Sequence, residues 1–444
     1  MTKYKPVIGL EVHVELKTKS KMFCGCSNDY FGKEPNTHTC PVCLGLPGAL
    51  PVPNKKAIQW CVMIGMALHC EIPMISKFDR KSYFYPDLAK GYQISQYDQP
   101  FAQNGFVTLS NKKIRIRRAH MEEDTGKLLH ATVNEKKVSL IDFNRSGVPL
   151  VEIVTEPDFE SAAEVKEYLQ KLQQIIRYLD ISNADMEKGE MRMEPNISLS
   201  SLRGGTTKQS LPNYKVEVKN INSFKFVEKA INYELKRQEA ILKEGNTPTQ
   251  ETRGWDENKQ KTFSQRVKGE AADYRYFPDP DIPPIKWSKE KLDSLKSLLP
   301  ELQDEKIARF EQIFSIPYYD AEILTREPNT ANFFEQTVKA SLHKYNIQPK
   351  TIANWIINKK INTNQTTPTQ LLQTIHSSTQ TVQIDKAEIT KVINQVLKEN
   401  TKAVEDFKKG KQASIMFLLG QVMRQMDKKV DATAVREAIG KSLK

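Results

Sequence analysis

Four cysteines gather in a short N-terminal window: Cys24, Cys26, Cys40 and Cys43. Each close pair can hold two corners of a tetrahedron around one Zn²⁺ from a tight turn. The spacing therefore predicts a structural zinc site that pins the chain over residues 24–43, and the alternative is a chance cluster of buried thiols. Cys61 and Cys70 lie outside the pattern and are expected in the core.

Length and charge limit the class of protein. A chain of 444 residues has room for about two to four domains. The formal charge of +12 favours a polyanionic partner, because Lys and Arg gain affinity by displacing phosphate counterions; a basic protein without such a partner is the alternative. No stretch approaches the ~18 apolar residues of a membrane span, and no secretory signal is recognisable. We therefore expect a cytoplasmic protein with reduced cysteines and no membrane partner.

The chain changes character near residue 287. Up to about residue 285 it reads mainly as short, alternating β-rich runs, whereas amphipathic helices are predicted from residue 288 onward. Prolines concentrated between residues 278 and 284 mark the boundary, because they prevent a regular helix or central strand. We predict an α+β fold in three parts: a β-rich domain over 1–287, an all-α domain over 288–400 and a small helical tail module over 401–444.

The tail module is basic. It contains ten Lys or Arg residues and five Asp or Glu residues. One predicted helix carries an apolar stripe: Ile415, Leu418, Leu419, Val422 and Met426. A second helix is predicted to begin at Asp431 as N-cap and to turn Val435, Ile439 and Leu443 inward. The charge suits contact with RNA, and an ordinary charged helical pair is the alternative.

Several predicted strands have one polar face. In an extended strand Glu11, His13 and Glu15 project together while the intervening valines point the other way. The same alternation recurs at residues 113–117, 151–156 and 215–219, and residues 120–124 add a histidine and three consecutive acids. For one strand alone, a solvated sheet face explains the pattern. Repeated on several strands, carboxylates with interspersed Lys and Arg suit a concave sheet that holds Mg²⁺ and phosphate.

Common nucleotide and hydrolase motifs are absent from the sequence. There is no Gly-x-x-x-x-Gly-Lys-Ser/Thr loop, no Gly-x-Gly-x-x-Gly and no Gly-x-Ser-x-Gly, which disfavours the P-loop, Rossmann and α/β-hydrolase classes. A Gly/Ser-rich amidase stretch is also absent. Any ammonia that this chain uses would have to come from elsewhere.

Longer motifs resemble the B-subunit family of tRNA-dependent amidotransferases. They are residues 7–16 (VIGLEVHVEL), 77–87 (KFDRKSYFYPD), 120–127 (HMEEDTGK), 152–158 (EIVTEPD), 217–224 (EVKNINSF), 273–278 (DYRYFP) and 417–423 (FLLGQVM). The resemblance covers nearly the whole chain and is weakest between about residues 340 and 400.

This resemblance implies a heterotrimer with a glutaminase A subunit and a small C subunit. Such an enzyme converts glutamyl-tRNA(Gln) to glutaminyl-tRNA(Gln), and commonly aspartyl-tRNA(Asn) to asparaginyl-tRNA(Asn). The B subunit would be the kinase and transferase half, using ATP, Mg²⁺ or Mn²⁺ and a structural Zn²⁺. The resemblance also implies a first domain related to glutamine synthetase and the guanidino kinases, and a tail that contacts tRNA.

The resemblance carries specific site residues. The implied cation ligands on the polar sheet face are Glu11, His13, Glu123, Glu152 and, at a position where the family often has the shorter Asp, Glu194. The implied phosphate contacts are Arg80, Lys81, Lys219 and Arg275, and surface ion pairing is the alternative for each. The expected catalytic set is Glu11, His13, Glu123, Glu152, Arg80 and Lys81. Tyr83, Tyr85 and Tyr92 are candidates to stack on a terminal adenine, or else core aromatics.

Two other classes of protein fit parts of the sequence. A non-catalytic tRNA-binding or assembly protein would need the charge, the cysteine quartet and the tail, and its carboxylates would serve solubility alone. A stand-alone ATP-dependent ligase would use free ammonia or glutamine, but the absent amidase stretch disfavours the glutamine-using version. Activity of Glu11→Gln and Glu152→Gln variants discriminates the first class, and amidation with an ammonium salt and no partner discriminates the second.

Overall fold

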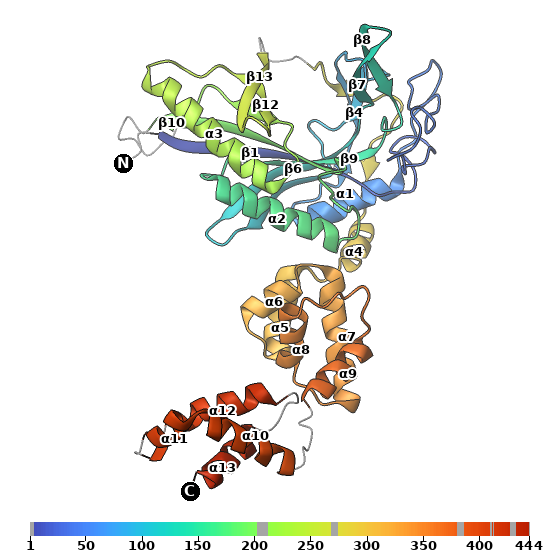
Figure 1. Ribbon diagram of the computed structural model, residues 1–444. Helices are drawn as coiled ribbons and strands as arrows, with labels where there is room; N and C mark the ends of the chain where they lie inside the picture. Colours follow the sequence, from blue (N-terminus) through green and yellow to red (C-terminus); the bar gives the residue numbers. More distant parts are fainter. Residues whose placement is uncertain are drawn as a thin grey trace. The chain divides into compact units, whose positions relative to one another are not determined.

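The computed structural model describes residues 4–201, 212–267, 274–379, 386–408, 411, 413–426 and 432–443. The chain divides into two compact units, Met1–Gln303 and Asp304–Lys444 (Figure 1). The first unit is built on sheets, and helices alone are found in the described residues of the second unit. This arrangement confirms the predicted α+β class.

An eight-stranded sheet organises the first unit. Its strands are β1 (Tyr4–Glu15), β5 (Ala102–Thr108), β6 (Lys113–Glu123), β9 (Pro149–Thr155), β10 (Met191–Ser201), β11 (Val216–Lys219), β12 (Glu251–Asp256) and β13 (Lys261–Val267). Their spatial order is β13-β12-β11-β10-β1-β9-β6-β5, with only the β11–β12 pair parallel. β1 is central, so the polar residues of its alternating pattern meet neighbours on both sides.

Three helices pack against the apolar side of this sheet: α1 (Lys55–Ala67), α2 (Ala162–Tyr178) and α3 (Phe224–Lys243). The even-numbered β1 residues Ile8 to Val14 are fully buried there. Each helix begins at a side chain that accepts hydrogen bonds from backbone N–H groups of the first turn, namely Asn54, Ser161 and Ser223. These three helices correct the expectation that this region is mainly β-rich.

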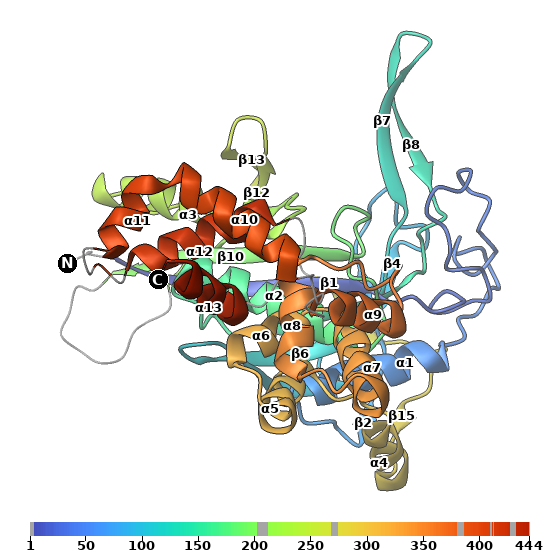
Figure 2. The same cartoon turned by 60° about the horizontal axis from the view of Figure 1, so that its bottom comes forward.

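Two smaller sheets stand apart from the main sheet. They are formed by β2 (Ile75–Ser76) with β15 (Ile285–Lys286), and by β3 (Asp79–Ser82) between β4 (Tyr92–Ser95) and β14 (Phe277–Pro278). The β14–β3 pair joins segments that are far apart in the sequence, with Phe277 opposite Arg80. A separate ribbon of β7 (Lys127–Val133) and β8 (Lys136–Asp142) projects from the main sheet (Figure 2).

The boundary between the units differs from the predicted residue 287. Helix α4 (Lys289–Ser297) contributes Leu295 to the core of the first unit, and Trp287 and Leu292 pack against it. The apolar side of α4 has its partners in the first unit, so that unit ends at Gln303.

The second unit contains two apolar cores. The first is formed by α5 (Gln303–Phe314), α6 (Tyr318–Leu324), α7 (Pro328–Lys344), α8 (Pro349–Asn358) and α9 (Pro368–Thr379). The second is formed by α10 (Lys386–Glu399), α11 (Thr401–Lys408), α12 (Ser414–Gln425) and α13 (Ala432–Ser442). Leu418, Val422, Val435 and Ile439 turn inward as predicted. The tail core also includes α10, which lies before the predicted residue 401, and the predicted N-cap Asp431 lies outside the described residues.

Candidate active site

A polar cavity of about 540 Å³ lies on the side of the main sheet that the helices leave open. Its floor consists of alternate residues of β1, β6, β9, β10 and β11, so its side chains come from distant parts of the sequence. Lys81 on β3, with residues 274 and 276 just before β14, forms a wall. The cavity therefore depends on strand register.

One cluster in the cavity is formed by His13, Glu122 and Glu152. Register places His13 and His120 opposite Glu152 from the two neighbouring strands. His13 Nε2 lies 3.5 Å from Glu122 Oε1 and 3.6 Å from Glu152 Oε2, and His120 Nε2 lies 3.3 Å from the same Glu152 oxygen. One imidazole with two carboxylates is a donor set that suits Mn²⁺ or Mg²⁺.

A second cluster is formed by Glu11, Glu194 and Glu217, which come from three adjacent strands. Glu11 and Glu194 are direct cross-strand partners. Asn196 Nδ2 donates to Glu11 Oε1 over 3.0 Å, and Thr252 Oγ1 donates to Glu217 Oε2 over 2.8 Å. Three carboxylates without nitrogen or sulfur form a donor set typical of Mg²⁺.

Cationic side chains border both clusters. Lys219 Nζ lies 2.9 Å from Glu194 and 3.6 Å from Glu217. Burial alone would lower the pKa of Lys219, but the charges of these two carboxylates raise it. The pKa of Lys81 is also raised despite burial, first by the charge of Glu122. Both lysines are therefore held as ammonium groups facing the cavity.

The first cluster is electrostatically strained. Burial alone would lower the pKa of His13, but the hydrogen bond and charge of Glu152, with the charges of Glu194 and Glu122, raise it to about 9. Burial opposes ionisation of Glu152, yet the charge and hydrogen bond of His120, together with His13, hold its pKa well below the usual range. Burial and the charge of Glu152 raise the pKa of Glu122. A divalent cation would relieve this concentration of negative charge.

A buried carboxyl pair consists of Asp124, which lines the cavity, and Glu15, which does not. Arg192 Nη1 lies 2.7 Å from Asp124 Oδ2, and the charges of Arg192 and Arg145 hold the Asp124 pKa far below normal despite burial. Burial and the charge of Asp124 raise the pKa of Glu15 to about 8. The hydroxyl of Tyr30 donates to Glu15 over 2.9 Å. The two carboxyl groups are thus shifted in opposite directions, with the protonated form favoured at Glu15 and the ionised form at Asp124.

Glu123, an expected cation ligand, lies outside this cavity. Its carboxylate points to the opposite side of β6, where it pairs with Lys90 and accepts a hydrogen bond from the backbone N–H of Ile94. A β-bulge between Ile116 and Arg118 causes the difference, because the extra residue shifts the alternation along β6. The position expected for Glu123 is occupied by Glu122.

Two of the four expected phosphate contacts also lie outside the cavity lining. Arg80 Nε donates to Asp279 over 2.8 Å and Arg80 Nη2 donates to Asp281 over 2.7 Å, on the other side of β3 from Lys81. Arg275 is exposed and does not line the cavity, although residues 274 and 276 do. Of the expected set, Lys81 and Lys219 line it.

The expected tyrosines separate in the same way. Tyr83 lines the cavity, whereas Tyr85 is 60% exposed outside the lining and Tyr92 lies beneath the guanidinium of Arg80, with 4.3 Å from its ring centroid to Arg80 Cζ. Tyr97, Tyr274 and Tyr276 also line the cavity, and none of the three was predicted from the sequence.

Five further lining residues were not predicted as site residues from the sequence, although four of them lie in polar runs noted there: His120, Glu122, Asp124, Arg192 and Glu217. The sequence does contain a signal for them, because each falls two residues from another lining residue, as Arg192 does from Glu194. The missing information was the strand order, which decides whether two polar faces meet in one cavity or in different places.

A smaller hollow of about 320 Å³ adjoins the cavity. The two share Glu11, Arg117, Val154 and Lys215. The hollow adds the polar side chains of Asn196 and Ser198 along the same face of β10. The open side of the sheet therefore offers two joined compartments, one rich in charge and one more mixed.

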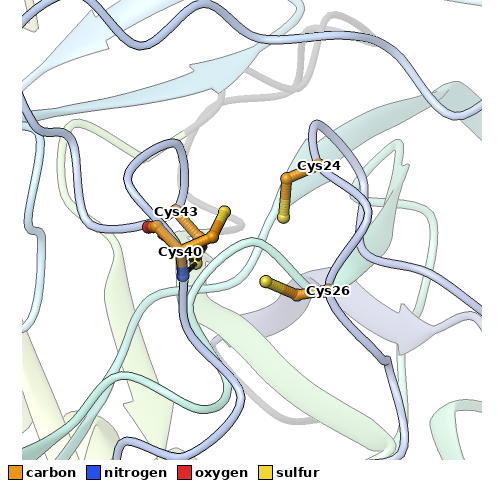
Figure 3. A group of neighbouring side chains, drawn as sticks. All are labelled: Cys24, Cys26, Cys40 and Cys43. Carbon is orange, nitrogen blue, oxygen red and sulfur yellow. Dashed lines mark hydrogen bonds between the residues drawn. The ribbon is translucent and has the colours of Figure 1, made fainter.

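The cysteine quartet lies together in the loops after β1. The four Sγ atoms all lie within 4.8 Å of one another. The four side chains point toward a common centre (Figure 3). The hydrogen bond from Cys24 lowers the pKa of Cys43 to about 5, and the fully buried Lys21 places Nζ 3.8 Å from Cys43 Sγ. Four sulfur donors beside a buried cation suit a tetrahedral Zn²⁺.

The cysteine loops pack against the end of β6. Met22 N–H donates to the Gly147 carbonyl over 2.7 Å, Ser146 Oγ donates to the Cys43 carbonyl over 3.0 Å, and Gly147 N–H donates to the Asp124 carbonyl over 2.9 Å. A positive φ of 86° at Gly147 allows this close turn. The quartet thus supports the end of β6, which carries Glu122, and Asp124 directly after it.

None of the helices that the structure describes is long and apolar enough to cross a membrane.

Comparison with known proteins covers nearly the whole chain. The sequence profile described as "GatB/GatE catalytic domain" matches residues 6–293, and that described as "GatB domain" matches residues 347–443. The B subunit of the aspartyl/glutamyl-tRNA(Asn/Gln) amidotransferase from Thermosipho melanesiensis is 44% identical, over 98% of this chain and 98% of its own. Those from Persephonella marina and Thermotoga petrophila are 43% and 42% identical, over 99% of this chain and 100% and 99% of their own. The chain therefore belongs to the GatB/GatE family, the B subunits of tRNA-dependent amidotransferases.

Proposed function

We propose that the cavity phosphorylates the side-chain carboxylate of an amino acid esterified to tRNA and then exchanges the phosphate for ammonia. The substrates would be glutamyl-tRNA(Gln), aspartyl-tRNA(Asn) or both. The observation that carries this proposal is the pairing of two carboxylate clusters with Lys81 and Lys219 in one cavity. Relatives over the full length are named as the B subunits of such enzymes, which supports the substrate class.

The chemistry explains why ATP is needed. A carboxylate resists attack by ammonia because its leaving group would be an oxide dianion. A carboxylate oxygen attacks the γ-phosphorus of ATP, the bond to the β–γ bridging oxygen breaks, and ADP leaves. The ammonia nitrogen then attacks the acyl carbon, phosphate departs with the C–O electron pair, and one proton leaves the nitrogen. Phosphoryl transfer is mainly positioning and charge neutralisation.

The chain's own residues supply positioning and charge. Lys81 and Lys219 are held as ammonium groups that can contact phosphate oxygens. Arg192 forms an ion pair with Asp124 at the cavity wall, and this pair holds both side chains in place. The two clusters, His13 with Glu122 and Glu152, and Glu11 with Glu194 and Glu217, would hold Mg²⁺ or Mn²⁺. When bound, such cations neutralise phosphate oxygens and polarise the phosphorus.

The hollow beside Glu11 is the proposed site for the nucleoside of ATP. It joins the charged cavity through Glu11, Arg117 and Lys215, so a nucleotide there would direct its phosphates toward the two clusters. Arg80 does not take part in phosphate binding in this proposal, because its guanidinium is engaged by Asp279 and Asp281.

Ammonia is proposed to come from a glutaminase A subunit, in a heterotrimer with a small C subunit. The absence of an amidase stretch from this sequence supports an outside source, and the names of the relatives describe B subunits of larger enzymes. An acyl phosphate hydrolyses readily, so protected delivery of ammonia favours amidation over loss to water. The reaction would take place in the cytoplasm, with tRNA.

Three further assignments support the same function. The cysteine quartet would bind a structural Zn²⁺, because four sulfur donors leave no position for a reacting water. The basic tail over 401–444, extended to include α10, is proposed to contact tRNA. We retain the relation of the first domain to glutamine synthetase and the guanidino kinases as a prediction.

The test is amidation of each mischarged tRNA by the reconstituted complex, with and without ATP. We expect product only with ATP and a divalent cation, and an ammonium salt should replace glutamine. Glu11→Gln and Glu152→Gln should abolish amidation while tRNA binding persists. Retained activity in both variants would instead favour the alternative of a non-catalytic tRNA-binding or assembly protein. Equal turnover of free glutamate would contradict the dependence on tRNA.

A further inference from the structure

A rim of four tyrosines borders the cavity: Tyr83, Tyr97, Tyr274 and Tyr276. Tyr97 and Tyr276 stack, with ring centroids 4.5 Å apart and an interplanar angle of 18°. Tyr274 meets Tyr276 edge-on at 6.1 Å and meets Tyr83 edge-on at 6.0 Å. The rings form one connected aromatic surface beside the carboxylate clusters.

The backbone holds this surface in place. The N–H of Tyr97 donates to Asp79 Oδ2 over 2.9 Å, and Asp79 itself is buried and paired with Lys77. The N–H of Ser82 donates to the Tyr274 carbonyl over 2.9 Å. Because β14 begins directly after Tyr276 and pairs with β3, the two ring-bearing segments are fixed to each other. A preorganised surface loses little entropy when it binds a ligand.

Of the stacked pair, Tyr97 is open to solvent and Tyr276 is half-buried. Tyr97 remains 54% exposed while one side of its ring contacts Tyr276. Two cations adjoin the rim: Arg118 Nη1 donates to the Tyr97 carbonyl over 3.3 Å, and Lys81 Nζ lies 4.8 Å from the ring centroid of Tyr274. Exposed aromatic rings beside cations are the means by which proteins hold single-stranded nucleotides.

We propose that the Tyr97–Tyr276 pair is the platform on which the 3′-terminal adenine of the tRNA stacks. This inference rests on the proposed function and adds the position of the RNA end. The body of an RNA has to stay outside the cavity, so its last base lies at the opening while the esterified amino acid reaches in toward Glu122 and Glu152. ATP carries no such body and can occupy the hollow beside Glu11.

Stacking can be measured directly with a fluorescent base. The probe is aminoacylated tRNA whose terminal adenosine is replaced by 2-aminopurine riboside, because stacking quenches its emission. Wild-type complex, Tyr97→Phe and the control Tyr85→Ala should quench it, since Phe retains the ring and Tyr85 lies outside the cavity lining. Tyr97→Ala should not quench it. Its KM for the aminoacylated tRNA should rise about ten-fold, with the KM for ATP unchanged.

Equal quenching by Tyr97→Ala and wild type would overturn the platform. Quenching that occurs only with 2-aminopurine riboside triphosphate would also overturn it, because the stacked base would then belong to the nucleotide. If Tyr97→Ala does not fold, Tyr276→Ala decides by the same measurements. No amidation by the wild-type complex would refute the proposed function, whereas normal amidation with unchanged KM in Tyr97→Ala and Tyr276→Ala would refute the platform alone.

Discussion

Glu122 and Glu123 are adjacent on β6, yet their carboxylates point to opposite sides of the sheet. Glu122 joins His13 and Glu152 in the cavity, and Glu123 pairs with Lys90 in the interior behind it. Glu123 is only 3% exposed. Two consecutive acids of the same type therefore have different physical roles, which substitution can separate.

Glu122→Gln should weaken binding of Mn²⁺ and lower kcat by at least about 10- to 100-fold, which is the loss typical of outer-shell groups that only orient a metal ligand. Its unfolding midpoint in urea should change little. Titration of Mn²⁺ by electron paramagnetic resonance measures the affinity. Unchanged Mn²⁺ affinity would exclude Glu122 from the cation site.

Glu123→Gln should have the reverse effects. It leaves the partly buried Lys90 without its carboxylate, and removal of one partner of a buried pair costs about 3–5 kcal/mol. We therefore expect a lower free energy of unfolding and wild-type Mn²⁺ affinity in the folded fraction. Loss of Mn²⁺ binding at full stability would return Glu123 to the cation site.

Binding of Mn²⁺ should depend on pH through His13. A His13 ligand must lose its proton, and its pKa without metal is raised to about 9, so affinity should rise about ten-fold per pH unit below that value. In His13→Gln the dependence should be much weaker. Calorimetric titration in buffers of different ionisation enthalpy counts the released protons. Proton release equal in the variant and wild type would assign the dependence to another group.

Stability should fall as pH rises, through Glu15. Its pKa is raised from 4.5 to about 8 in the folded chain, so between these values the folded state binds more protons than the unfolded state. The contribution is present at the acidic end of this window and is lost as pH rises through about 8. Urea unfolding across the window should show this loss in wild type. In Glu15→Gln it should disappear, whereas parallel curves for the two proteins would contradict the shift.

Removal of zinc should loosen the end of β6. The purified chain should contain about one zinc, and Cys43→Ser should lose it and melt at a lower temperature. Cys70→Ser is the matched control, since Cys70 lies outside the quartet. Metal analysis and thermal unfolding of both variants provide the measurement. Full zinc content in Cys43→Ser would remove Cys43 from the ligand set.

The polar strand faces could be predicted from sequence because alternation has a period of two. Glu11 and His13 on β1 and Glu152 on β9 lie where that period places them. Glu123 does not lie where the period places it, because the bulge between Ile116 and Arg118 shifts the alternation of side chains along β6. The sequence contains no clear local signal for this bulge.

Long-range pairing set the other limit. Arg80 and Lys81 are adjacent and both basic, and which of them faces the cavity depends on the pairing of β3 with β4 and β14. The pairing of β14 with β3 likewise brings Tyr276 beside Tyr97. Strand order is determined by the whole chain, so a motif read alone cannot supply it.

The bulge in β6 also constrains how such a chain can vary in length. Deleting its extra residue would exchange the two acids that follow, so that Glu123 faced the cavity and Glu122 the interior opposite Lys90. A related chain without this extra residue would keep the cavity only if the polar and apolar positions from Ala119 onward were also exchanged. Point substitutions in β6 are therefore far more accessible to evolution than a change of one residue in its length.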